Sequence, residues 1–311
     1  MLADNKPVQD AMIERHLAEC GFLWMQPKND GMRTYIGDNA VPQTRSGKEW
    51  KHKPLRAFAQ SIPSLRGKDG EVSPGHIFDP NSFRDAMSSI RAEDGTREFT
   101  FYLFDNVALD SYAYEHRFNN LMEWIAANGE WHEGDGFHAR VLMTETQKVE
   151  SLEEVHRIAE EHIVFGWEGS MLRRPDRRYK FGRSTNLGGE LIKLKRYEDA
   201  EAVVVGYEAW ERNENEPTQS PLGRQVRSAH QENKVPIERL GALHVELLTD
   251  RSVKFKIGVM SGISHAERDR LWAVRDSLMG RICTFKHQGY SGGYDAPRTP
   301  VFLHWRSASE F

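Results

Sequence analysis

The stretch that organises the rest of the chain is Met25-Gln26-Pro27-Lys28-Asn29-Asp30-Gly31-Met32-Arg33-Thr34-Tyr35. An apolar run ends just before Lys28, and a second extended run begins at Met32. Asp-Gly between two strand-like runs is a strong hairpin signal, because glycine can adopt the positive φ of a tight turn. The sequence therefore predicts a β-hairpin with Lys28 at its lip.

Lys28 has two interpretations that this stretch alone does not separate. The simpler one is a solvated lysine beside an ordinary turn. In the other, the lysine is a nucleophile, which requires burial or a neighbouring cation to lower a lysine pKa from its usual value of about 10.4. Arg33 and the apolar run supply those two influences, whereas Asp30 favours the charged amine.

The composition indicates a globular protein, with 39% hydrophobic and 28% charged residues among 311. This length allows two separate cores. No stretch approaches the roughly 18 to 20 apolar residues of a membrane span, and the first 20 residues lack the apolar centre of a signal peptide. Cys20 and Cys283 fit neither a disulfide framework nor a zinc site. We therefore expect a cytoplasmic protein with reduced thiols and no membrane partner.

Charge is segregated along the chain, although the net charge is only −4. Basic residues gather between Met171 and Arg196, and acidic residues gather in 145–161 and 198–216. One face can therefore attract phosphate while the whole chain remains slightly acidic.

Helical and strand patterns alternate in the first part of the chain. They predict helices over 7–20, 111–128 and 151–165, strands over 99–107, 139–143 and 191–195, and a second Asp-Gly turn within 67–72. The strand over 191–195 places Lys193 and Lys195 on one face. This pair fits either phosphate binding or an edge strand that lysines protect from aggregation.

After Lys195 the pattern becomes one of short strands. They are predicted over 202–210, 241–248, 253–258, 281–290 and 301–306, with one helix over 265–278. Five strands with a helix in that place suit a small Greek-key barrel of the oligonucleotide-binding kind. Residues 211–239 are polar without apolar periodicity, which predicts a mobile arm that orders on a polyanion.

Several short motifs follow one another in a specific order. They are Lys28-x-Asp30-Gly31-x-Arg33, Thr44-Arg45-Ser46-Gly47-Lys48, Asp69-Gly70-Glu71, Phe104-Asp105, Glu168-Gly169-x-Met171-Leu172-Arg173 and Lys193-x-Lys195. There is no P-loop and no His-Glu-x-x-His, so any phosphate chemistry must use side chains. The motif order resembles that of the covalent nucleotidyltransferases, which include ATP-dependent DNA ligases, RNA ligases and mRNA capping enzymes.

Within that superfamily the chain resembles the minimal DNA ligases of bacteriophages and large algal viruses. Residues 223–241 are similar to the DNA-wrapping latch of the algal-virus enzyme, and Pro297-Arg298-x-Pro300-x-Phe302 is similar to its C-terminal motif. The ending departs from the Arg-x-Asp-Lys form of larger ligases.

The resemblance implies an α+β protein of two domains. Residues 1–197 would form a nucleotidyltransferase domain, the ATP-grasp-like adenylation domain of DNA ligases, built from antiparallel sheets with helices. Residues 198–311 would form an all-β OB-fold barrel with a latch-like polar insert at about 211–240.

The resemblance also implies a reaction and its residues. Lys28 would attack ATP to give a lysyl-AMP, AMP would pass to a 5′-phosphate at a nick in duplex DNA, and the 3′-hydroxyl would displace it. Such an enzyme serves DNA replication, repair or recombination, uses Mg²⁺ or Mn²⁺, and works as a monomer. The implied catalytic residues are Lys28, Asp30, Lys193 and Lys195, and the implied metal ligands are Glu168 and Glu71. The implied nucleotide ligands are Gln26, Lys28, Arg33, Glu71, Phe104, Lys193, Lys195 and Arg298. The implied DNA contacts are Arg33, Arg45, Lys48, Arg183, Arg224, Arg227 and Lys234.

Two alternatives remain open at this point. An RNA end-joining ligase shares the Lys-x-Asp-Gly chemistry, and a nucleic-acid-binding protein without activity could keep the same folds. Radiolabelling from α-labelled ATP, and the nucleic acid on which the label then leaves, would separate all three.

Overall fold

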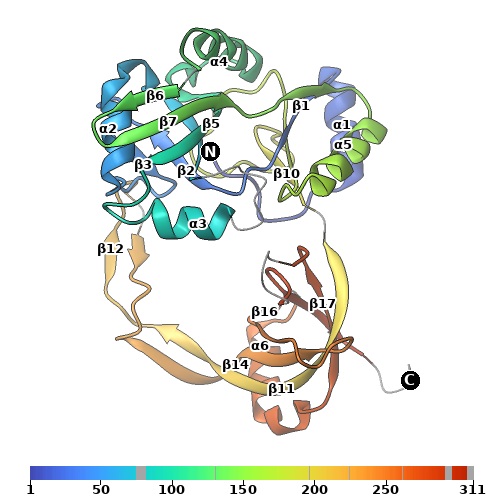
Figure 1. Cartoon of the computed structure of the whole chain (residues 1–311). Helices are drawn as coiled ribbons and strands as arrows, with labels where there is room; N and C mark the ends of the chain where they lie inside the picture. Colours follow the sequence, from blue (N-terminus) through green and yellow to red (C-terminus); the bar gives the residue numbers. More distant parts are fainter. Residues whose placement is uncertain are drawn as a thin grey trace. The chain divides into compact units, whose positions relative to one another are not determined.

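The computed structural model describes residues 1–74, 82–129, 131–195, 197–223, 225–260, 262–290 and 296–306. The chain divides into two compact units, Met1–Lys195 and Arg196–Phe311 (Figure 1). Both contain β-sheets with helices, so the predicted α+β class is confirmed. No helix in these described ranges is long and apolar enough to cross a membrane.

The first unit contains a four-stranded antiparallel sheet. Its strands are β1 (Leu23–Pro27), β8 (Gln147–Val149), β9 (Ser170–Arg173) and β10 (Ile192–Leu194), in the order β10-β9-β1-β8. Helices α1 (Asp10–Cys20) and α5 (Leu152–Val164) pack on this sheet, and Ile13, Leu17, Val155 and Ile158 join its core. Ser151 caps α5 by accepting from the Glu154 N–H at 3.2 Å, at the start of the helix predicted over 151–165.

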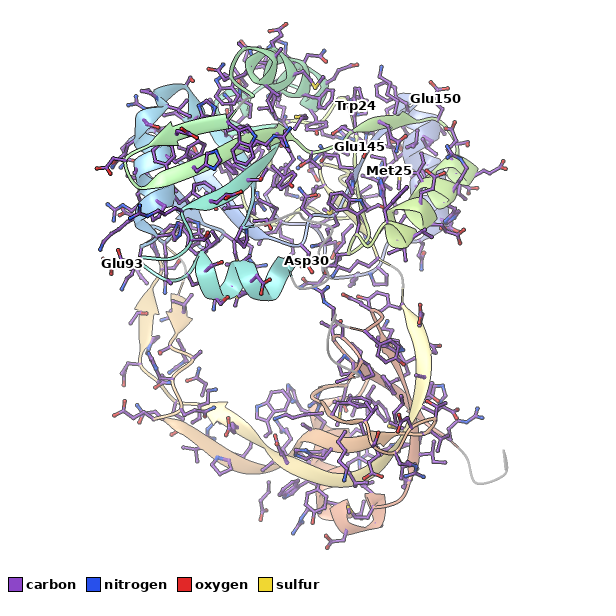
Figure 2. The ribbon with its side chains drawn as sticks, viewed as in Figure 1. Trp24, Met25, Asp30, Glu93, Glu145 and Glu150 are labelled. Atoms are coloured by element: carbon purple, nitrogen blue, oxygen red, sulfur yellow. The ribbon has the colours of Figure 1, made fainter. Side chains whose placement is uncertain are left out.

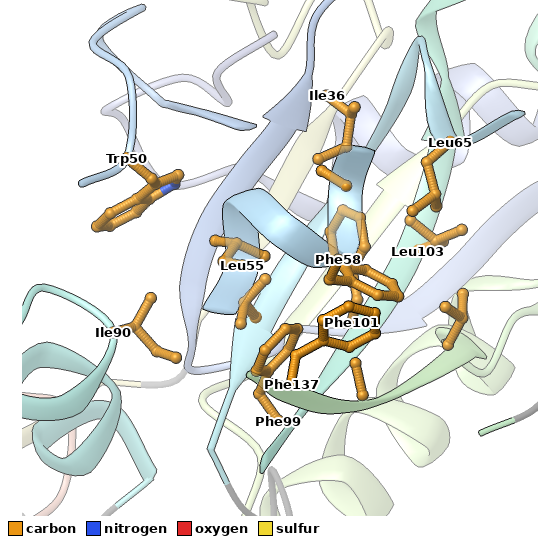
Figure 3. Packing of buried hydrophobic residues seen from close by; sticks show 14 of the residues in the cluster. Ile36, Trp50, Leu55, Phe58, Leu65, Ile90, Phe99, Phe101, Leu103 and Phe137 are labelled. Carbon is orange, nitrogen blue, oxygen red and sulfur yellow. The ribbon is translucent and has the colours of Figure 1, made fainter. Parts of the chain in front are cut away.

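A six-stranded sheet forms the other half of this unit. Its strands, in spatial order, are β3 (Pro42–Thr44), β2 (Met32–Ile36), β4 (Lys68–Ser73), β5 (Glu98–Asn106), β7 (Phe137–Met143) and β6 (Trp131–Gly134). The helical segments beside it are α2 (Lys53–Ser61), η1 (Pro63–Leu65), α3 (Ser82–Ser89), η2 (Val107–Leu109) and α4 (Tyr114–Asn128). Phe58 of α2 packs edge-on against Phe99 and Phe137, with ring centroids 5.5 and 5.7 Å away (Figure 3). This aromatic cluster fixes α2 on the sheet.

The hairpin predicted for Met25–Tyr35 is wrong. β1 pairs with β8 and β9, whereas β2 pairs with β3 and β4, so both edges of each strand are already occupied. The connection therefore crosses from one sheet to the other, and the chain can be followed in Figure 2 from Trp24 and Met25 to Asp30. Gly31 is needed for space, because an added Cβ would lie 2.8 Å from the Val72 carbonyl oxygen.

The Asp-Gly turn predicted within 67–72 is also wrong at Asp69-Gly70. β4 runs through both residues and pairs with β5, with a register shift between Asp69 and Gly70. A Cβ on Gly70 would lie 2.4 Å from the Tyr102 carbonyl oxygen. The glycine therefore permits a close approach of two strands instead of a reversal of the chain.

The second unit is built on one sheet. Its strands are β11 (Glu198–Asn213), β14 (Lys234–Leu247), β15 (Lys254–Ile257), β16 (Val259–Met260), β17 (Ile282–His287) and β18 (Val301–Trp305), in the order β15-β14-β11-β17-β18-β16. Helix α6 (His265–Ala273) and η3 (Arg275–Leu278) follow β16. Leu271 and Leu278 join Phe285 and Phe302 in its core. Strand pairing within the described ranges does not join β15 to β16 into a closed ring.

The irregular arm predicted for 211–239 is wrong. β11 and β14 continue their ladder outward to the pair Asn213 and Lys234, and β12 (Pro217–Gln219) pairs with β13 (Gln225–Arg227) beyond it. Asn215 closes the base by donating to the Ser228 and His230 carbonyl oxygens at 3.1 and 2.9 Å. Its strands were missed because polar side chains occupy both faces, so no period-2 apolar pattern marks them.

Candidate active site

Three chain segments meet at one end of the four-stranded sheet. β9 lies between β1 and β10 and is antiparallel to both, and Ser170 is opposite Pro27 on one side and Leu194 on the other. The residues that follow β1 and β10 and those that precede β9 must therefore lie together. These residues are Lys28, Lys195 and Glu168.

Glu168 forms ion pairs with both lysines. Lys28 Nζ contacts one carboxylate oxygen and Lys195 Nζ contacts the other. The three side chains are 25%, 12% and 9% exposed for Lys28, Lys195 and Glu168. Burial disfavours the charged carboxylate, but the charges of Lys28 and then Lys195 outweigh it and lower the pKa of Glu168.

Gly169 allows this arrangement. The Lys28 N–H donates to the Gly169 carbonyl oxygen at 2.8 Å, which joins the end of β1 to the start of β9. Gly169 has a φ of +144°, and a Cβ there would lie 2.6 Å from the Leu194 carbonyl oxygen. Only glycine fits a position with both constraints.

Lys193 and Lys195 lie on β10 and directly after it, at the edge of this sheet. The edge position fits lysines that protect an edge strand from aggregation. Lys195, however, forms an ion pair with Glu168. Burial lowers the pKa of Lys195 against the attraction of Glu168. Burial also lowers the pKa of Lys193, and the charge of Lys28 acts in the same direction.

Glu71 of β4 faces the same charges from the six-stranded sheet. Its Oε2 atom is buried without a hydrogen-bond partner in the described part of the chain. Burial raises the pKa of Glu71 to about 8, although the charges of Lys28 and Arg33 oppose the rise. A cation beside this carboxyl would relieve the cost of its ionisation.

Two carboxylates near Lys28 are candidates for metal binding. No group of three or more His, Cys, Asp and Glu residues within the described ranges is placed to hold a metal ion. Mg²⁺ commonly takes one or two carboxylates and completes its octahedron with water and phosphate oxygens. Glu168 and Glu71, whose Oε2 atom has no hydrogen-bond partner among the described residues, fit that pattern.

Arg33 is held inside the first unit. Its Nε donates to Asp69 Oδ1 at 3.0 Å, and it also contacts the Met1 carbonyl oxygen. Tyr179 donates to Asp69 Oδ2 at 3.1 Å. As a phosphate ligand, Arg33 would need to leave or share this ion pair.

Phe104 lies half-buried on β5 beside two guanidinium groups. The Cζ atoms of Arg33 and Arg173 are each 5.6 Å from the ring centroid. The next residue, Asp105, is fully buried and accepts from Arg117 Nε at 2.8 Å and Arg173 Nη1 at 2.7 Å. Sequence reasoning missed both arginines as partners. The available signal was the aspartate in an apolar strand, which requires a cation when buried.

Gln26 is buried, and its amide donates to Thr146 Oγ1 at 2.8 Å and to Tyr114 Oη at 3.2 Å. Asp30 lies in the connection between β1 and β2. Arg45 and Lys48 are exposed in the turn after β3. Arg183 is exposed and donates to the Ala3 carbonyl oxygen and to Asn5 Oδ1, both at 2.7 Å.

The remaining predicted residues belong to the second unit. Arg227 on β13 donates to the Asn215 carbonyl oxygen, and Lys234 on β14 lies 3.9 Å from Glu211. The Arg298 N–H donates to the Gly289 carbonyl oxygen at 2.9 Å. Arg224 lies outside the described residues.

Comparison with known proteins finds a family match within the second unit and similar folds among solved structures. Residues 233–306 match the family model described as DNA ligase OB-like domain. A search of curated proteins found no match. Among solved structures, the Chlorella virus DNA ligase-adenylate has 24% sequence identity and a TM-score of 0.52, and the alignment covers 98% of each chain. A Lig E DNA ligase has 23% identity and a TM-score of 0.65 and covers 92% of this chain and 93% of its own.

The chain therefore has the two-domain fold of these DNA ligases, with the strand ends that carry Lys28, Glu168 and Lys195 in its first unit. The second unit contains the match to the DNA ligase OB-like domain. The resemblance drawn from the order of the motifs is confirmed at the level of the fold.

Proposed function

We propose that the protein is an ATP-dependent DNA ligase that seals nicks with a 3′-hydroxyl and a 5′-phosphate, through a lysyl-AMP and a DNA-adenylate. The observation that carries this proposal is the meeting of Lys28, Glu168 and Lys195 at three adjoining strand ends. It supplies an amine at the end of a strand with fixed positive charge beside it. That combination suits attack on a phosphate.

In the first step the Lys28 amine attacks the α-phosphorus of ATP. The N–P bond forms, the P–O bond to diphosphate breaks, and a proton leaves Nζ. Because Lys28 donates to Glu168, the amine has to leave this ion pair and give up a proton before it attacks. Lys193 and Lys195 stabilise the charge that develops on phosphate oxygens.

Glu168 and Glu71 are the residues that would hold a Mg²⁺ or Mn²⁺ ion, which when bound supplies positive charge to the phosphates. Phe104 would stack on adenine. Asp30 and Glu71 would address the ribose, and Gln26 and Arg298 complete the proposed nucleotide ligands.

In the later steps AMP passes from Lys28 to the 5′-phosphate of the nick, as the P–N bond breaks and a P–O–P bond forms. The 3′-hydroxyl then attacks the 5′-phosphorus and AMP leaves. Exposed Arg45, Lys48 and Arg183 are the proposed phosphate contacts of the first unit. Arg33 would contribute if the nucleotide or DNA separates it from Asp69. Such a reaction serves DNA replication, repair or recombination.

The experiment that tests the proposal follows labelled AMP. The protein is incubated with α-³²P-ATP and Mg²⁺, and the labelled protein is divided between nicked duplex DNA and single-stranded RNA with a 5′-phosphate. We expect label on the protein, its loss on nicked DNA, and a sealed strand. Transfer to RNA alone would assign the chain to RNA end joining, and absence of any covalent label would refute a nucleotidyltransferase.

A further inference from the structure

Phe181 is an exposed aromatic residue of the first unit. It lies in the connection between β9 and β10, the strands adjoining Glu168 and Lys195, and it is 71% exposed. A single exposed hydrophobic side chain needs no functional explanation. Two further features distinguish Phe181: its ring packs against Tyr179, and cationic residues flank it in the sequence.

The ring of Phe181 packs against the ring of Tyr179. The two rings make an edge contact with centroids 5.2 Å apart and planes at 67°. Tyr179 is fixed in turn, since its hydroxyl donates to Asp69 at 3.1 Å and its N–H donates to the Asp110 carbonyl oxygen at 3.1 Å. The exposed ring is therefore presented by a support that reaches the Arg33–Asp69 ion pair.

Three cationic residues lie within three positions of Phe181 in the sequence. Arg178 and Arg183 are exposed, and the Lys180 side chain is 41% exposed. Aromatic rings set among cations are the usual means of binding nucleotides without sequence preference, because every base offers a face for stacking and every nucleotide a phosphate.

We propose that Phe181 packs against the base or deoxyribose of a nucleotide that flanks the nick, while the neighbouring cations neutralise its phosphates. This inference rests on the proposed ligase function and adds a contact that carries no charge. At a nick one phosphodiester bond is broken and a terminal base can unstack, so an aromatic ring can stack on the base face that becomes exposed.

The test compares Phe181→Ala and Phe181→Trp with Phe165→Ala. Phe165 is a matched control, because it is 67% exposed at the C-terminal cap of α5 and follows Glu160 and Glu161 instead of arginines. The measurements are the Kd for a nicked duplex with a dideoxy 3′-end and the fluorescence of 2-aminopurine placed on either side of the nick. The salt dependence of binding is measured with the same duplex.

We expect Phe181→Ala to weaken nick binding roughly tenfold, the usual effect of removing one stacking side chain. The change in 2-aminopurine fluorescence that wild-type protein causes on binding should be absent with Phe181→Ala. It should be retained with Phe181→Trp. The slope of log K against log salt should stay as in the wild type, because a phenyl ring releases no counterion. Arg183→Ala should instead reduce this slope by about one.

Failure of the proposed role of Phe181 can be distinguished from failure of the proposed ligase function. If wild-type protein forms lysyl-AMP and binds nicked DNA, but Phe181→Ala behaves like Phe165→Ala, the role of Phe181 is refuted and the ligase function stands. If wild-type protein neither takes label from ATP nor binds nicked DNA, the proposed function fails and this inference fails with it.

Discussion

At the scale of single residues, the centre of the proposed site is one carboxylate between two ammonium groups. Lys28, Lys195 and Glu168 together carry one net positive charge, and Lys193 lies on the same edge. An incoming triphosphate can therefore exchange places with Glu168 as the partner of the lysines. The geometry suits a site that holds its cations in place before the nucleotide arrives.

Replacing the nucleophile tests its chemistry separately from its charge. Lys28→Ala and Lys28→Arg should both abolish the covalent AMP adduct, because arginine keeps the charge but does not lose its proton in proteins. The adduct is measured as radiolabel on denatured protein. Sealing of a nick that already carries AMP should persist in part, since that step uses no lysine nucleophile. An adduct in either variant would place the nucleophile elsewhere.

The raised pKa of Glu71 predicts how the free energy of unfolding depends on pH. Its pKa is raised from 4.5 to about 8 in the folded protein, so between these values the folded state binds more protons than the unfolded state. The free energy of unfolding therefore loses a contribution as pH rises through this window. Glu71→Gln should remove that loss, so its stability relative to the wild type should increase from pH 5 to pH 8.

The measurement is urea unfolding of both proteins at pH 5 and pH 8. Glu98→Gln, an exposed glutamate at the start of β5, is the control and should show no such trend. An equal difference between wild type and Glu71→Gln at both pH values would show that the Glu71 carboxyl titrates as in the unfolded chain.

At the scale of elements, the site depends on how closely β9 and β10 approach. Gly169→Ala would place a Cβ 2.6 Å from the Leu194 carbonyl oxygen at a φ of +144°. We expect a loss of about 1 to 3 kcal/mol from backbone strain alone, with the steric contact adding to it. Gly136→Ala is the control, because Gly136 has a φ of +87° but nothing within 4 Å.

Thermal and urea unfolding compare these two variants, and adduct formation reports on the geometry of the site. Gly169→Ala should be the less stable variant and should form lysyl-AMP more slowly, because the shift of β10 moves Lys195 away from Glu168. Equal stability of the two variants would mean that β10 moves aside without cost.

At the scale of the whole molecule, the second unit adds an ordered hairpin to an OB-like sheet. The β12–β13 hairpin continues from β11 and β14 and carries Arg227. Deleting residues 216–228 removes Arg224 and Arg227, so we expect the log–log salt slope for nicked DNA to flatten by about 2 if both arginines contact phosphate. Lys234 remains in this variant, paired in the ladder with Asn213.

Adduct formation by the deletion variant provides the control, since that step uses no DNA. We expect adduct formation close to that of the wild type and slower sealing. An unchanged salt slope would reduce the hairpin to a surface feature and would remove the main support for a latch.

Much of the architecture follows from local patterns in the sequence. Apolar alternation marks β5, because Phe99, Phe101 and Leu103 all pack into one core. Ser151 and Glu154 form a Ser-x-x-Glu capping box that marks the start of α5, and Gly21 with a φ of +82° ends α1 where the helical periodicity stops. Such features depend on a few neighbouring residues, so the sequence contains them.

The sequence by itself determined which residue types occur and in what order, and that order was enough to identify a ligase fold. Only the tertiary structure decided which strands pair. β1 and β2 are separated by a short Asp-Gly connection and still belong to different sheets, because other strands occupy both edges of each. The contact between Lys28 and Glu168 joins residues 140 positions apart, so no local pattern can encode it. The register of β9 between β1 and β10 creates that contact and thereby the proposed site.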